Sequence, residues 1–168
     1  MASLYLIPNG PAPTTAAQAP VTTGTAIKTM LQVKPFNLMR VVEWGISFDG
    51  FAAALPIRCE LLSTGTVAAT VTASVDADIT RYTHPAASTA PSVAGLTLGT
   101  AATGYTASAE GTITATDHFD FQFISPTNQY VKQFPLGREP VIPVTDYLRI
   151  RVTAGTAVNC YCYILCEV

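Results

Sequence analysis

Charged residues are scarce in this sequence of 168 residues. Lysine and arginine together number nine, aspartate and glutamate eleven, and the formal net charge is −2. Charged residues thus make up 12% of the chain, against about 25% in an average soluble domain. Disorder requires low hydrophobicity and high net charge, whereas 49% of this sequence is apolar. The composition excludes a disordered chain, and the lack of a basic surplus argues against nucleic-acid binding through phosphate contacts.

Long apolar runs are also missing. No stretch approaches the roughly 18 apolar residues of a membrane-spanning helix. The first apolar run, Leu4–Ile7, ends at Pro8, short of the roughly 7–15 residues in the apolar region of a secretory signal. We therefore expect no membrane partner and synthesis in a cytoplasm.

Residues that carry chemistry are few. The two histidines, His84 and His118, lie far apart, and His118 shares only a predicted strand face with Asp120, a pairing common on any solvent-facing strand. The sequence has no nucleophile elbow, zinc-protease motif or phosphate-binding loop. We expect no enzymatic activity, no catalytic residues and no cofactor.

The cysteines do not follow a common zinc-binding spacing. Cys160, Cys162 and Cys166 recur at even intervals and so share one face of a strand, while Cys59 alternates with polar neighbours. We expect four reduced, buried thiols and no metal site. Two acidic residues at a strand end, Asp76 and Asp78, are too few for calcium, which needs about six oxygen ligands.

Period-two alternation dominates the chain from residue 25 onward and predicts strands. The clearest runs are 27–33, 38–48, 55–62, 67–75, 119–123, 148–152 and 158–168. In run 119–123 the three phenylalanines project to one side, and His118, Asp120 and Gln122 to the other. Ala154–Thr156 is typical of a tight hairpin between the last two strands.

The fold class predicted from these runs is all-β, because no window of 11 or more residues carries a helical stripe. About eight to ten short strands favour a two-sheet sandwich, jelly-roll-like. An immunoglobulin-like topology is the alternative, but Trp44 precedes all four cysteines, so the Cys–Trp–Cys order of that fold is lacking.

Two segments fall outside the alternation. Residues 1–24 are rich in Pro, Ala and Thr and predict an extended arm before a single domain at 25–168. Residues 80–111 predict a long loop excursion with at most a short strand at 95–98 or near Tyr105. Long loops in compact domains are usually functional or packed on a neighbour.

We expect both segments to contact other subunits, and we expect the fold to be independent of residues 2–20. The candidate interface residues are Leu4, Tyr5, Leu6, Ile7, Tyr82, His84 and Tyr105. Other surface aromatics, Tyr130, Tyr161 and Tyr163, favour sheet packing or interface burial over sugar binding, because few acidic or amide side chains neighbour them.

Several segments resemble the small auxiliary head proteins of tailed bacteriophages. They are Arg40–Gly50, the Ala-rich 51–55, Ile57–Leu62, Lys132–Glu139 and Tyr147–Val152. The resemblance covers about half of the chain and lies in short segments and in the general character of the sequence. It implies a capsid decoration (cement) protein: an all-β, often trimeric subunit that sits on the outer shell and bridges major capsid subunits.

The expected function is therefore that of a virion structural protein on the capsid exterior, with the major capsid protein and further copies of itself as partners. Two alternatives stay open. One is a receptor- or glycan-binding module of a tail fibre or surface structure. The other is a small viral coat protein, although residues 1–27 lack the Lys and Arg of a genome-packaging arm.

Overall fold

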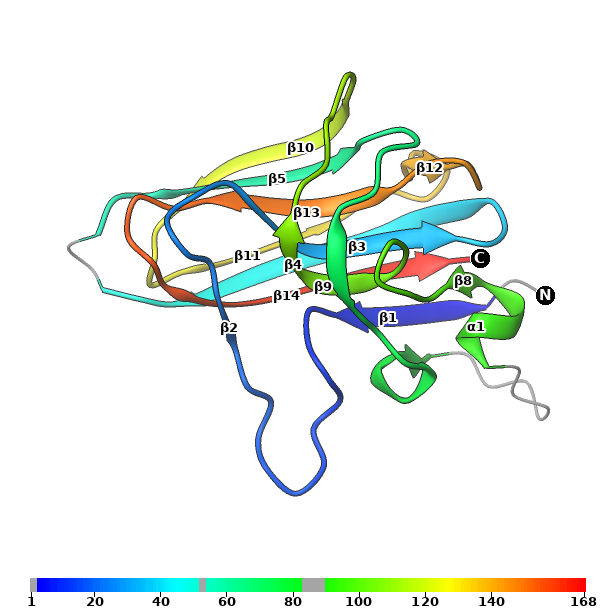
Figure 1. Cartoon of the computed structure of the whole chain (residues 1–168), viewed down its shortest axis with the longest axis horizontal. Coiled ribbons are helices and arrows are strands. Elements are labelled where there is room, and N and C mark those ends of the chain that lie inside the picture. Colours follow the sequence, from blue (N-terminus) through cyan, green and yellow to red (C-terminus); the bar gives the residue numbers. More distant parts are fainter. Residues whose placement is uncertain (1–2, 52–53, 83–89) are drawn as a thin grey trace.

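The computed structural model describes residues 3–51, 54–82 and 90–168, which form two antiparallel sheets packed face to face (Figure 1). Sheet A consists of β1 (Leu4–Pro8), β2 (Val21–Thr22), β4 (Met39–Asp49), β7 (Thr80–Arg81), β11 (Gln129–Gln133), β12 (Val141–Ile142) and β14 (Asn159–Glu167). Sheet B consists of β3 (Lys28–Pro35), β5 (Ile57–Ser63), β6 (Thr70–Ala73), β8 (Leu96–Thr97), β9 (Gly104–Ala109), β10 (Asp117–Ile124) and β13 (Leu148–Thr153). The helical elements are η1 (Asp76–Asp78) and α1 (Pro91–Ala94).

The strand order is that of a jelly roll. The principal strands in chain order are β1, β3, β4, β5, β10, β11, β13 and β14. In sheet A, β1 (first) lies beside β14 (eighth), followed by β4 (third) and β11 (sixth). In sheet B, β3 (second) lies beside β13 (seventh), followed by β5 (fourth) and β10 (fifth). This interleaving of two Greek keys defines the jelly roll. The predicted fold class is confirmed.

Alternation along β14 separates the core from the surface. The side chains of Cys160, Cys162 and Ile164 are fully buried between the sheets, while Tyr161 and Tyr163 point to the outer face. All four cysteines are free and buried, as predicted. Burial raises the pKa of the Cys166 thiol to about 12, so this thiol is a protonated apolar side chain in the core.

The N-terminal segment differs from the expected arm. Residues 4–8 form β1, which pairs with β14 on one side and β7 on the other. Tyr5 and Ile7 are at most 1% exposed and belong to the core. Residues 2–20 therefore include part of the core, and the expectation that the fold is independent of them is corrected. The run Leu4–Ile7 is short, entirely apolar and ends at Pro8, so it lacked the alternation that marks a strand.

The expected hairpin at Ala154–Thr156 is also wrong. β13 lies in sheet B and β14 in sheet A, so this connection crosses from one sheet to the other. The last two strands thus lie in opposite sheets, which a tight hairpin does not allow. The 80–111 excursion contains β7, α1, β8 and β9, which is more regular structure than the expected loop with at most a short strand at 95–98 or near Tyr105.

β10 contains a bulge that reverses its expected faces. The pairing with β5 shifts by one residue between His118 and Asp120, which leaves Phe119 as the additional residue. Asp120 consequently points inward and is 8% exposed, while Phe121 and Phe123 point outward. The prediction that Asp120 lies on the solvent face with His118 is corrected.

Asp120 links the two sheets at their open edge. Its carboxylate accepts hydrogen bonds from the Trp44 indole at 3.1 Å and the Tyr130 hydroxyl at 2.9 Å. Lys132 lies 3.3 Å away, and the Gln122 amide donates at 3.0 Å. Burial alone would raise the pKa of Asp120, but the hydrogen bonds from Gln122 and Tyr130 and the charge of Lys132 outweigh it and lower the pKa.

Asp120→Asn tests this link. A carboxyl group whose pKa is lowered on folding stabilises the folded state at pH values above its unfolded pKa of about 3.9. That stabilisation is lost as the pH falls through the folded pKa. The variant should lose about 1–3 kcal/mol of unfolding free energy at pH 7 and show a flatter stability profile below pH ~4. Denaturant titrations followed by Trp44, the single tryptophan, measure both.

Asp117→Asn, an exposed change on the same strand, is the matched control and should retain the wild-type profile. An Asp120→Asn variant whose stability falls with acid as steeply as that of the wild type would contradict the assigned role of this carboxylate.

Candidate docking face

The outer face of sheet A carries a group of apolar and tyrosine side chains. The strand register aligns Val131, Gly45, Tyr163 and Pro8 in one row across β11, β4, β14 and β1. We call the whole set the tyrosine face; it comprises Leu4, Leu6, Pro8, Tyr82, Val131, Tyr161, Tyr163 and Leu165.

A glycine sets the centre of this face. A Cβ at Gly45 would lie 2.5 Å from Cε1 of Tyr163, so the tyrosine ring lies flat over the β4 backbone only because no side chain is there. In this position the Tyr163 hydroxyl donates a 2.5 Å hydrogen bond to Glu43 Oε1. Burial and this carboxylate raise the pKa of Tyr163 well above its usual range.

Three tyrosines gather here from distant parts of the chain. The rings of Tyr161 and Tyr163 lie 6.3 Å apart, with an interplanar angle of 38°. The backbone N–H of Tyr82 donates to Leu4 O, which continues β7 beside β1. Burial raises the pKa of Tyr161, with smaller contributions from Cys162 and Tyr82. Neutral phenols therefore cover this region, and each offers ring area and one polar hydroxyl.

A groove of about 500 Å³ runs along one border of the face. Its floor includes Leu6, Pro8 and Tyr161, and residues of the loop between β1 and β2 form its wall: Ala12, Pro13, Gln18 and Pro20. A shallower hollow of about 250 Å³ adjoins it and shares Ser47 and Tyr161. The two hollows form one continuous depression over β14 and β4.

Two buried polar side chains hold the wall of the groove in place. The Asn9 side chain makes the two hydrogen bonds to β14 that a neighbouring strand would make. Its Oδ1 accepts a hydrogen bond from Cys162 N at 3.0 Å, and its Nδ2 donates one to Cys160 O at 3.3 Å. Asp78 Oδ1 accepts from Ala12 N at 3.1 Å. The wall is thus fixed by hydrogen bonds at its beginning and in its middle.

The polarity of this face is unusual for an outer sheet surface. An antiparallel sheet normally alternates apolar residues toward the core with polar residues toward water. Here the outward positions carry Leu, Pro, Val and Tyr beside Glu43, Ser47 and Gln129. Tyr82 and Val131 remain 55% and 53% exposed. Contiguous exposed apolar area of this kind marks interaction sites. These features make the tyrosine face a candidate docking surface.

The predicted interface residues divide between this face and the core. Leu4, Leu6 and Tyr82 lie on the tyrosine face. Tyr5 and Ile7 lie in the core. Tyr105 lies in sheet B on β9, partly buried against the core, where burial and then Asp78 raise its pKa. His84 lies outside the described residues.

Sequence reasoning assigned Tyr161 and Tyr163 to an outward strand face but did not select them as interface residues. The evidence that selects them is the register with β4 and β1, which places Gly45 and Pro8 beside Tyr163. A glycine inside an alternating strand was the available signal, because such a glycine often marks a close approach.

The acidic residues near the groove have structural roles. Asp76 accepts from Ser92 N at 2.8 Å and from Ser92 Oγ at 2.6 Å, which attaches α1 to η1. Within residues 3–51, 54–82 and 90–168, no group of three His, Cys, Asp or Glu side chains is placed to hold a metal ion. No helix in the same ranges has the length and apolarity required to span a membrane.

Comparisons with protein-family models, with curated proteins and with solved structures find no match to this chain.

Gly45→Ala should disturb the tyrosine face selectively. The added methyl group displaces the Tyr163 ring and breaks its hydrogen bond to Glu43, which costs about 1–3 kcal/mol, as typical overpacking does. Because Glu43 helps to raise the Tyr163 pKa, one tyrosine should ionise at lower pH in an ultraviolet absorbance titration. Unchanged titration and stability would contradict the close approach of Tyr163 to Gly45.

Proposed function

We propose that this chain is a virion structural protein, a decoration subunit that binds the outer surface of a tailed-phage head and stabilises contacts between major capsid proteins. The tyrosine face is the surface that docks on the shell. The observation that carries the proposal is an outer sheet face lined by apolar and tyrosine side chains and left uncovered by the chain's own sandwich.

Its composition suits a protein partner. Tyrosine is enriched at protein–protein interfaces, and charged residues are depleted at their centres. Charged side chains lie toward the ends of β4 and β14, where Asp49 is at one end and Arg40 and Glu167 are at the other. Glu43 accepts the hydrogen bond of Tyr163. A shell also presents many copies of the same binding site. A specific protein–protein interface buries about 1,600 Å² of accessible surface in total.

The fold and the resemblance support the same proposal. Jelly rolls form viral capsid domains as well as lectins and cupins, so the fold alone does not decide between these functions. The resemblance of Arg40–Gly50 and the other segments to auxiliary head proteins favours the capsid exterior, after synthesis in the host cytoplasm.

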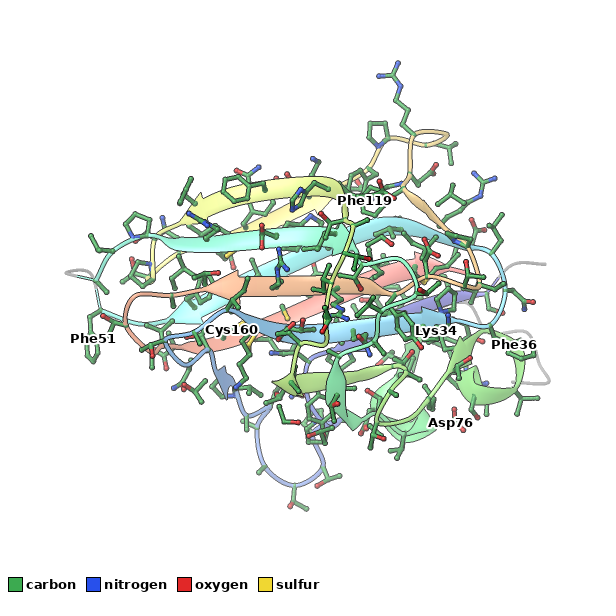
Figure 2. The ribbon with its side chains drawn as sticks, turned by 45° about the horizontal axis from the view of Figure 1, so that its top comes forward. Lys34, Phe36, Phe51, Asp76, Phe119 and Cys160 are labelled. Atoms are coloured by element: carbon green, nitrogen blue, oxygen red, sulfur yellow. The ribbon has the colours of Figure 1, made fainter. Side chains whose placement is uncertain are left out.

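The proposed assembly on the shell is a homotrimer. Large apolar side chains are exposed at both ends of β4, Phe36 and Leu38 before it and Phe51 and Leu55 after it. Figure 2 shows Phe36 and Phe51 at opposite ends of the molecule, and the 11 residues of β4 span about 35 Å. When one end of a subunit contacts the opposite end of the next subunit, the repeated contact can close into a ring of subunits.

Binding to heads assembled without the protein tests the proposal. Tyr82→Ser and Tyr163→Ser should each weaken binding about tenfold or more, because aromatic anchors at the centre of an interface contribute most of its affinity. Co-sedimentation of the purified variants with the heads measures the loss.

Phe121→Ser is the matched control, an exposed aromatic on the opposite sheet, and it should bind the heads like the wild type. The proposal fails if the wild-type chain does not bind the heads. It also fails in its choice of surface if Phe121→Ser weakens binding and the two tyrosine variants do not.

A further inference from the structure

The outer face of sheet B carries a second aromatic cluster, which the docking face does not use. Phe121 and Phe123 on β10 meet edge to face, with ring centroids 5.1 Å apart and an angle of 86°. They are 43% and 63% exposed. The Arg58 guanidinium of β5 lies 5.9 Å from one ring centroid and 5.8 Å from the other. We call these three residues the aromatic–arginine platform.

The guanidinium of the platform is available to a ligand. Arg58 is exposed, and its contacts within the described ranges are the two phenyl rings. The neighbouring Arg151 is neutralised, since its Nε lies 2.8 Å from Glu60 Oε2. A guanidinium with free N–H groups binds a carboxylate in a bidentate manner, so the platform is built to hold one carboxylate beside an apolar surface.

Polar groups extend from the platform across the same face. The register aligns Phe123, Arg58 and Thr153 in one row, and the Thr153 hydroxyl is buried without a hydrogen-bond partner within the described part of the chain. The next row holds Phe121 and Glu60.

The platform continues along β10 toward a cleft. His118, half exposed, lies 3.4 Å from Glu60 Oε1. Beyond it a cleft of about 300 Å³ opens at the start of β10, and its lining includes Thr64, Thr66, Thr114 and Thr116. Aromatic rings, the Arg58 guanidinium and a cleft lined by threonines thus follow one another over β10 and β5.

We propose that this line binds a polysaccharide chain that carries carboxylate groups. A sugar carboxylate is held by Arg58, the adjacent sugar ring stacks on Phe121 and Phe123, and sugar hydroxyls occupy the threonine-lined cleft. Asp117 also lines that cleft, so the acidic group of the ligand belongs at the platform and neutral hydroxyls belong at the cleft.

The surroundings favour a sugar over a protein partner. Interface centres are depleted in charged residues, whereas the Glu60–Arg151 ion pair and His118 lie beside these rings. Hydroxyl groups of a sugar find donors and acceptors among such side chains. The site lies on the sheet opposite the tyrosine face, so both surfaces can be occupied together.

Titration calorimetry with defined polymers tests this site on the full chain. Polygalacturonate and polysialic acid both carry sugar carboxylates and distinguish a uronic from a sialic acid; dextran is neutral, and poly-L-glutamate carries carboxylates on a peptide. At least one acidic polysaccharide should bind at least tenfold more tightly than dextran and poly-L-glutamate. Arg58→Gln should weaken that binding roughly tenfold or more, and Phe123→Ala should weaken it severalfold.

Arg138→Gln removes the same charge from an exposed loop position and should leave the affinity unchanged. The fluorescence of Trp44 verifies that every variant is folded. The proposal is overturned if neither acidic polysaccharide binds. It is also overturned if poly-L-glutamate binds as tightly as the acidic polysaccharides and without dependence on Phe123, or if Arg138→Gln and Arg58→Gln lose affinity equally. Binding of Arg58→Gln to phage heads should be unaffected, which separates this site from the proposed docking function.

Discussion

A two-layer sandwich covers only one face of each of its sheets, and this constraint determines the surface of the molecule. β14 shows it most directly, because Cys160, Cys162 and Ile164 fill the core from one side while Tyr161 and Tyr163 remain on the other. The same strand pairs with β1 and β4, so its outward residues form the centre of the uncovered face. Burial of apolar area is the main favourable contribution to association, and the tyrosine face is where this chain still has such area to bury.

The two outer faces differ in chemistry, so the subunit has two chemically distinct sides. Sheet A presents tyrosines and aliphatic side chains over a shallow groove, whereas sheet B presents an ion pair, a free guanidinium and exposed phenyl rings. A decoration subunit bound through sheet A would turn sheet B toward the medium. Pairing through the edge strand β10 is disfavoured, because this strand carries a bulge and the inward charge of Asp120, both of which protect sheet edges.

Strand alternation was sufficient to predict the sandwich, its jelly-roll character and the burial of the four cysteines. It failed where one residue or one distant partner changes the outcome. The additional residue Phe119 reverses the faces of β10, which no period-two count detects. β1 is stabilised by pairing with β14, far away along the chain, so the short run that ends at Pro8 gave no sign of its place in the core. Tyr163 over Gly45 and Arg58 beside Phe123 are consequences of register, which pattern alone does not determine.

The central claim is that the tyrosine face is the surface through which this protein binds its particle. Hydroxyl-radical footprinting of the protein, free and bound to phage heads, tests this claim without any substitution. The account predicts that oxidation of Tyr82, which is 55% exposed in the free chain, falls strongly on the head while Phe121 and Phe123 remain as reactive as before. Protection of the two phenylalanines with Tyr82 unprotected would contradict it.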